Sequence, residues 1–187
     1  MKKLIIFEGI DGSGKTTQAR YFAKKLKAVY LSEPKFFRQQ IFSSIQPLTE
    51  LFLFLADRSE VYQQIKKILT KKNVVLDRSF PSTLAYQLEG RSLKNLISIE
   101  EYLKLDLIVR QKIEPDIVFI FDLPVSIALS RLKKKTKFEK LKFLEKVRKA
   151  YLKLAKIFNW YVIDANQSRE KIRAQIVSIL QKEGLLR

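Results

Sequence analysis

Short apolar runs alternate along the chain with longer segments in which apolar residues recur at helical spacing. The apolar runs predict five strands, at residues 4–7, 28–31, 73–76, 116–121 and 161–163. The fourth run is almost wholly apolar, as expected for a central strand that is buried on both faces. Strands alternating with helices in this way predict an α/β fold in which helices cover both faces of a parallel sheet.

The intervening segments predict helices that begin near residue 15, over 36–45, 49–69, 98–113, 125–132 and 144–158, and after Ser168. Ser98 and Glu101 spell a capping box at one start, and Ser168 is an N-cap at another. The 49–69 segment carries apolar residues beyond a single stripe, including Phe52 and Phe54. Such a helix usually contacts the core on one side and a ligand or second subunit on the other.

Length and composition narrow the class of protein. With 187 residues, 47% of them hydrophobic, we expect one domain spanning 1–187 with its own core. The absence of cysteine excludes disulfides, thiol catalysis and cysteine-bound zinc, and the absence of histidine leaves a carboxylate or the substrate as any general base. No apolar run has the length of a signal peptide core or a membrane span, so we expect no membrane partner and a cytoplasmic location.

The net charge of +18 raises the alternative of a polynucleotide binder, because a basic surface attracts phosphates regardless of sequence. The lysines fall mainly on the outer faces of the predicted helices, and no basic stretch interleaved with aromatic residues is present. The charge therefore favours a solvated surface, and we expect no nucleic-acid partner. A steep salt dependence of DNA affinity would support the alternative.

The segment between the first strand and the first helix has the pattern of a phosphate-binding loop. Two glycines five apart are followed by Lys and Thr, between a predicted strand and a predicted helix. Glycines let the backbone curl so that its N–H groups point inward, and the helix start adds its positive end. The predicted ATP-binding residues here are Gly9, Ile10, Asp11, Gly12, Ser13, Gly14, Lys15, Thr16 and Thr17. Lys15 would reach the outer phosphates and Thr16 would hold Mg²⁺.

Asp77 and Arg78 directly follow the third predicted strand. Because ligands of parallel α/β sheets bind at the carboxyl ends of the strands, we expect both side chains beside the phosphate loop. Asp77 is a candidate magnesium ligand, and Arg78 can clamp a second phosphate bidentately. A surface Asp–Arg pair is the alternative for these two residues. Farther on, the basic break within 133–142 predicts either a solvated loop or a lid over anionic phosphates.

Three stretches jointly resemble the thymidylate kinase family: 7–18 with the phosphate loop, Glu50 to Arg58, and Asp77 to Gln87. Shorter second-half motifs, such as Asp122-Leu-Pro124 and Ala128-Leu-Ser-Arg131, extend the resemblance over nearly the whole chain. It implies a P-loop NTPase fold with strand order 2-3-1-4-5, and a homodimer. It also implies transfer of the γ-phosphoryl group from ATP to dTMP with Mg²⁺, giving dTDP and ADP for dTTP synthesis.

The resemblance also implies roles for individual residues. Phe54 would stack on thymine, Arg58 would hydrogen-bond the carbonyl edge of the base, and Tyr86 would stand where a 2′-hydroxyl clashes. The residues implied in dTMP binding are Asp11, at the sugar 3′-hydroxyl, Arg38 and Arg78, at the phosphate, and Phe54, Arg58, Ser82, Thr83 and Tyr86, around the base and sugar. The implied catalytic residues are Lys15, Asp11, Arg78 and Arg131, while Arg131, Asn166 and Gln167 complete the ATP site.

Two departures from the family pattern stand out. The family usually has Arg-Glu-Pro-Gly-Gly-Thr where this chain has Ser-Glu-Pro-Lys-Phe-Phe at 32–37, so the acceptor loop must be built differently. The lid segment offers lysines in place of the arginines usual in members with Gly at position 12, with Arg131 just before it. Lysine neutralises phosphate charge but lacks the planar two-pronged grip of arginine.

The sequence is also compatible with two other functions. One is a kinase for another nucleoside monophosphate such as UMP or dUMP, which a panel of monophosphates with ATP and Mg²⁺ would reveal. The other is a nucleotide-gated binding module without acceptor chemistry, which would bind ATP tightly but form no ADP with any monophosphate.

Overall fold

The computed structural model describes residues 2–43, 46–132 and 140–186. Its centre is a five-stranded sheet of order β2-β3-β1-β4-β5, in which every neighbouring pair is parallel. The strands are β1 Leu4–Gly9, β2 Val29–Ser32, β3 Val74–Asp77, β4 Ile117–Asp122 and β5 Tyr161–Asp164. The predicted strands and their order are confirmed.

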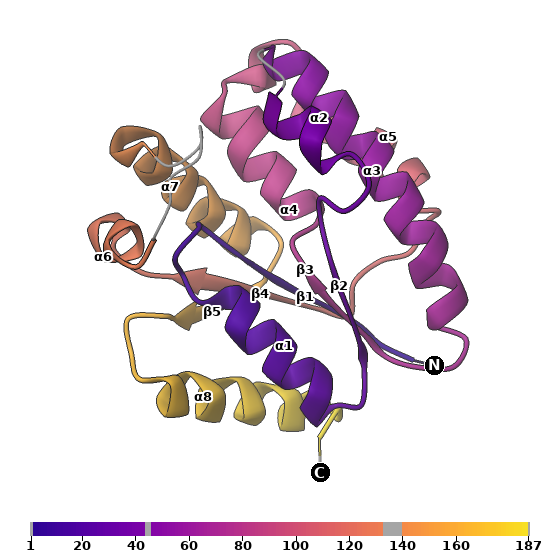
Figure 1. Cartoon of the computed structure of the whole chain (residues 1–187), viewed down its shortest axis with the longest axis vertical. Helices are drawn as coiled ribbons and strands as arrows, with labels where there is room; N and C mark the ends of the chain where they lie inside the picture. The colour runs from indigo at the N-terminus through magenta and orange to yellow at the C-terminus, as the bar shows by residue number, and fades with distance from the viewer. Residues whose placement is uncertain (1, 44–45, 133–139, 187) are drawn as a thin grey trace.

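Helices cover both faces of the sheet, as predicted (Figure 1). Helices α1 (Lys15–Lys25) and α8 (Arg169–Lys182) lie on one side, while α7 (Leu141–Ile157) and the helical segment after β3 lie on the other. The other helices of the described residues include α2 (Arg38–Ser43), the long α3 (Pro47–Ile68), a 3₁₀ turn (Leu93–Asn95), α5 (Ile99–Val109) and the short α6 (Val125–Ser130).

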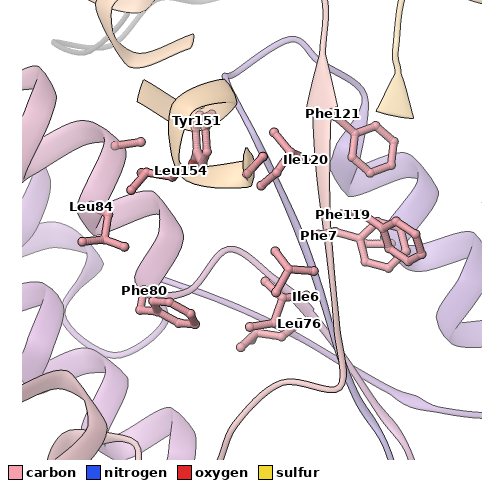
Figure 2. Packing of buried hydrophobic residues seen from close by; sticks show 14 of the residues in the cluster. Ile6, Phe7, Leu76, Phe80, Leu84, Phe119, Ile120, Phe121, Tyr151 and Leu154 are labelled. Atoms are coloured by element: carbon pink, nitrogen blue, oxygen red, sulfur yellow. The ribbon is translucent and has the colours of Figure 1, made fainter. Parts of the chain in front are cut away.

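Alternation along the central strands divides the core into two layers (Figure 2). Phe7 of β1 points to the side of α1, where its ring stacks on Phe22 at 6.1 Å between centroids. Ile6, one residue earlier, points to the opposite side, toward Phe80 and Leu84. The central strands are therefore buried on both faces, and their carboxyl ends are held at a common edge.

The helical segment at residues 80–90 was not predicted. A short α4 (Phe80–Thr83) continues as a π-helix over Leu84–Gly90. Phe80, Leu84 and Leu88 are buried at a spacing of four, which is a helical signal, but sequence analysis interpreted the motif from Asp77 to Gln87 only for its chemistry. π-Helical turns are frequent at functional sites.

Three predicted helices are shorter than expected, and the one predicted over 125–132 ends at Ser130. The helix predicted over 36–45 begins only at Arg38, because the amides of residues 35–37 donate to the Asp57 carboxylate instead. The helix predicted over 98–113 ends at Val109, and Gln111 and Lys112 follow with left-handed φ values of 53° and 60°. Hydrogen bonds from distant backbone amides to Asp57, and positive φ values at Gln111 and Lys112, do not produce a periodic pattern of apolar residues.

The basic lid predicted at 133–142 falls mainly outside the described residues, and only Lys140 to Lys142 lie within them, at the start of α7. Among the described residues, no helix is both long and apolar enough to cross a membrane. The expected cytoplasmic location stays a prediction.

Gly12 and Gly14 offer a test of how the phosphate loop packs. Both have φ of 83°, but a Cβ on Gly12 would lie 2.1 Å from the Ala128 carbonyl oxygen of α6, whereas a Cβ on Gly14 would meet no atom of the described residues within 4 Å. We expect Gly14→Ala to cost about 1–2 kcal/mol from left-handed strain. Gly12→Ala should cost about 1–3 kcal/mol more, because α6 must move.

Thermal unfolding of the two variants measures this difference, at about 2–4 °C per kcal/mol for a chain of this size. Equal melting temperatures for the two variants would contradict the close packing of the loop on α6.

Candidate active site

The phosphate loop joins β1 to α1 at the carboxyl edge of the sheet. Gly14 is the N-cap residue of α1 in left-handed conformation, and the first turn of the helix carries no acidic side chain. A pocket above this turn is lined by Asp11, Gly12, Ser13, Gly14, Lys15, Thr16, Thr17, Gln18, Arg131, Leu132, Ala165, Gln167, Arg169 and Ile172. The helix start therefore opens into a hollow with the free amides and positive potential that anions favour.

Most of the residues predicted for ATP line this first pocket. The exceptions are Gly9 and Ile10, which lead from β1 into the loop, and Asn166, which is exposed in the turn after β5 and donates its backbone N–H to Asp164. Arg131 ends α6 and contacts the Ala165 carbonyl oxygen at 3.4 Å. Arg169 and Ile172 were missed, because the start of the last helix carried no motif beyond its cap.

Asp11 joins this pocket to a second one. Its Oδ1 lies 2.7 Å from the Arg78 guanidinium and 3.5 Å from the Lys15 ammonium. Burial acts to raise the pKa of Asp11, but the charges of Arg78 and Lys15 outweigh it and hold that pKa below its usual range. Burial and the nearby Arg78 charge lower the pKa of Lys15. One carboxylate thus separates two cations that would otherwise repel each other.

Asp77, predicted to follow the third strand, is the last residue of β3 and pairs with Phe7 of β1. Its Oδ2 accepts hydrogen bonds from the hydroxyls of Thr16, at 2.6 Å, and Tyr30, at 3.0 Å. Its Oδ1 is buried and has no hydrogen-bond partner among the residues that the structure describes. A hydroxyl and a carboxylate with a spare oxygen, beside a phosphate pocket, form a donor set that fits Mg²⁺. Tyr30 was missed by sequence analysis because its position in β2 predicts only packing.

Arg78 is held by contacts from several elements. Its φ is 71°, and its backbone N–H donates to the Phe7 carbonyl oxygen at 3.0 Å. Its guanidinium also donates to the Ser82 hydroxyl at 3.0 Å. The fully buried Glu8 accepts from the backbone N–H of Ser79 and from the Ser82 hydroxyl, each at 2.6 Å.

Glu8 therefore anchors the turn that carries Arg78. It also accepts from the Tyr151 hydroxyl of α7 at 2.8 Å. Burial raises the pKa of Glu8, while Arg78 and these hydrogen bonds act in the opposite direction. Sequence analysis missed this role, because a Glu inside an apolar strand does not reveal its partners.

The second pocket lies between the phosphate loop, the segment after β2 with α2, α3 and the segment after β3. It is lined by Asp11, Glu33, Pro34, Arg38, Phe42, Phe54, Arg58, Arg78, Ser79, Ser82, Tyr86 and Gln87. Every residue predicted for the acceptor is among them except Thr83, which lies behind the wall and accepts a hydrogen bond from Arg58. Gln87 was not predicted to line the pocket, although it is the last residue of the motif from Asp77 to Gln87. Its side-chain amide donates a hydrogen bond to the buried Glu50 at 2.8 Å.

Arg58 is fully engaged within the protein. Its five N–H groups make five hydrogen bonds, to Glu33 twice and to Tyr102, Asp106 and Thr83 once each. Burial raises the pKa of Glu33 to about 8, although Arg58 acts against this rise. The contact of Arg58 with a base stays a prediction, and it requires one of these five bonds to be exchanged.

Known proteins are similar to this chain over nearly its whole length. The family model described as thymidylate kinase matches residues 7–176. The chain belongs to the thymidylate kinase family. A probable thymidylate kinase of Methanocaldococcus jannaschii is 40% identical over 187 residues, covering 95% of each chain. A probable thymidylate kinase of Saccharolobus solfataricus is 37% identical, covering 97% of this chain and 98% of the relative.

A solved structure of a thymidylate kinase from Ehrlichia chaffeensis superposes with a TM-score of 0.77 at 28% identity, covering 96% of this chain and 98% of that one. The region matched by the thymidylate kinase model runs from Phe7 in β1 to Ile176 in α8 and so includes the linings of both pockets. Membership in the thymidylate kinase family therefore applies to the site as well as to the sheet.

The cluster beneath the second pocket predicts a strong effect of removing its central charge. We expect Arg58→Met to lower the free energy of unfolding by about 1–3 kcal/mol, because the buried Glu33 loses both of its hydrogen bonds from Arg58, while Asp106 keeps its ion pair with Arg110. Chemical denaturation measures the loss. The matched control is Lys66→Met, at an exposed position on the same helix, which should change stability by less than about 0.5 kcal/mol. A loss equal to that of the control would refute the anchoring role.

Proposed function

We propose that this chain transfers the γ-phosphoryl group of ATP to dTMP, yielding ADP and dTDP. The observation that supports this most directly is the position of Asp11 between Lys15 and Arg78, where the two pockets meet. Each of two phosphate-bearing ligands then has its own cation, and the reacting phosphates meet between them. Family membership supports the choice of ATP and dTMP as the pair.

The donor occupies the first pocket. Loop residues from Asp11 to Thr17 would surround its phosphates with backbone N–H groups, which Gly9 and Ile10 lead into place. Lys15 would hold the outer phosphates, and Arg131 would stand beside them from the end of α6. Gln167, with Asn166 next to it, would border the adenine.

Thr16 and Asp77 would hold the magnesium ion, because the unpartnered Oδ1 of Asp77 is the kind of oxygen that this cation takes. When bound, Mg²⁺ neutralises negative charge on the phosphates of the donor.

The acceptor occupies the second pocket. Arg38 and Arg78 would bind its phosphate, and Phe54 would stack on the pyrimidine. Tyr86 and Asp11 line the wall where we place the sugar, with Asp11 at the 3′-hydroxyl. Ser82, Thr83 and Arg58 belong to the wall that would face the base, with Arg58 and Thr83 hydrogen-bonded to each other.

The reaction needs little covalent chemistry from the protein. An oxygen of the dTMP phosphate attacks the γ-phosphorus, a new P–O bond forms, and the bond from the γ-phosphorus to the β,γ-bridging oxygen breaks. The attacking oxygen is already ionised, so no general base is required, which agrees with a chain that lacks histidine. Lys15, Arg78 and Arg131 would align the reactants and stabilise the charge of the transition state.

A homodimer is part of the proposal. Phe52 and Leu48 on α3 are 56% and 44% exposed, although both are large and apolar. Apolar side chains that gather on one helix outside the core are typical of a subunit interface.

Lys15→Ala tests the donor assignment. We expect dTMP-dependent ADP formation to fall at least 10³-fold, because Lys15 is the cation that the phosphate loop itself presents to the outer phosphates. A coupled assay with dTMP, dUMP, dCMP and UMP as acceptors measures the rates, and Lys24→Ala, at an exposed position of α1, is the control. Circular dichroism should show the fold retained. Turnover within tenfold of the wild type would overturn the assignment.

Asp77→Asn tests the cation site separately. An amide oxygen is a weaker ligand than a carboxylate, so we expect the Mg²⁺ concentration for half-maximal rate to rise about tenfold or more. Titration of the initial rate with MgCl₂ measures this value, with Asp116→Asn, before β4, as the control. An unchanged magnesium requirement would exclude Asp77 as a ligand.

A further inference from the structure

The segment that departs from the family pattern is held by one carboxylate. The backbone N–H groups of Lys35, Phe36 and Phe37 all donate to Asp57, at 2.9, 2.6 and 2.8 Å to its Oδ1, and Lys35 also reaches its Oδ2 at 2.9 Å. Asp57 lies on α3 and is fully buried. Four hydrogen bonds to one buried charge define the conformation of this segment.

Successive N–H groups that converge on one point form a cradle of the kind that binds phosphate. Here the protein's own carboxylate fills it, so residues 35–37 have no amide to offer an acceptor phosphate. The glycines of the usual family pattern are replaced by Lys35 and Phe36. Glycine permits a ligand to approach the backbone closely, and this is not needed where the amides are already bonded to Asp57. Binding of the acceptor phosphate therefore falls to side chains.

The clamped residues lie between two groups of the acceptor pocket. Pro34 precedes them and Arg38 follows them, and both line that pocket. The next residue on α3, Arg58, holds Glu33 through two hydrogen bonds. Two consecutive side chains of one helix thus hold residues 33–37 at both ends.

Arg38 itself has few restraints. Its side chain is exposed, and its guanidinium lies 4.8 Å from the centre of the Phe42 ring. Its backbone position is set by the residue before it, whose N–H is bonded to Asp57. The reach of Arg38 into the pocket therefore depends on that bond.

Building on the proposed function, we propose that Asp57 is the positioning residue for acceptor binding: by clamping the amides of residues 35–37, it places Arg38 at the acceptor phosphate without touching the substrate. The ligand class is a nucleoside monophosphate, whose phosphate is held by guanidinium groups in place of loop amides.

Asp57→Asn tests the inference. Asparagine has nearly the same shape, but it offers one acceptor oxygen, and its NH₂ faces the N–H groups and repels them. We expect the KM for dTMP to rise at least tenfold, while kcat and the KM for ATP stay within twofold. Glu60→Gln, at an exposed position on the same helix, is the control and should leave all three values unchanged.

A double-mutant cycle separates positioning from a merely structural role. Arg38→Ala alone should raise the KM for dTMP at least tenfold, and Asp57→Asn added to it should raise that KM by less than twofold further. An equal effect of Asp57→Asn with and without Arg38 would overturn the inference. If Asp57→Asn fails to fold, Asp57→Glu, which moves the charge by one methylene, takes its place in the same cycle with the same expected outcomes.

The wild-type assay distinguishes this inference from the function on which it rests. Absence of ADP formation with every monophosphate would refute the proposed function. A wild type that is active with dTMP, and whose KM is unchanged by Asp57→Asn, would refute only the positioning role.

Discussion

The site depends on one electrostatic arrangement, in which the Asp11 carboxylate lies between the Lys15 ammonium and the Arg78 guanidinium. Two cations this close repel each other when buried, and an anion must stand between them. In the free protein Asp11 is that anion. In the proposed reaction, the negatively charged phosphates of the two substrates also lie between these cations. The repulsion between the Lys15 and Arg78 charges, which is unfavourable to folding, is therefore favourable to substrate binding.

The rest of the fold serves to hold these groups at one edge. Parallel pairing brings the end of β3 beside β1, which places Asp77 and Arg78 next to the phosphate loop. Glu8 anchors the turn after Asp77, and Gly12 lets the loop rest against the backbone of α6. The first contact uses a buried carboxylate, and the second brings two backbone segments close together. Both contacts fix the positions of the residues at the carboxyl edge of the sheet, where the phosphates must align.

The parts that sequence analysis predicted have local signals. The strands follow from apolar runs, the phosphate loop from glycine spacing, and the positions of Asp77 and Arg78 from the rule that parallel strands end at a common edge. The resemblance to a family supplied the acceptor residues, and the second pocket gathers all of them except Thr83, which lies just behind its wall.

The helical segment at residues 80–90 was missed although it has a local signal, but the missed contacts that build the acceptor pocket are long-range polar pairings. Nothing near Asp57 in sequence indicates that it binds the amides of residues 35–37, and nothing near Arg58 indicates that Glu33, Tyr102, Thr83 and Asp106 use all its donors. Such pairs join elements that meet only after the chain has folded. These pairings determine which side chains form the wall of the acceptor pocket. The apolar runs and the glycine spacing predict only that a pocket lies at this edge of the sheet.

The central claim is that one crevice holds two phosphate-bearing nucleotides, with Lys15 on the donor side and Arg78 on the acceptor side. A crystal structure with adenosine and thymidine joined by a chain of five phosphates tests it most directly. The account predicts that Arg78 contacts the phosphate nearest thymidine, that Lys15 contacts the phosphates on the adenosine side, and that thymine lies against Phe54. An Arg78 that contacts no oxygen of the ligand, with thymidine outside the second pocket, would contradict it.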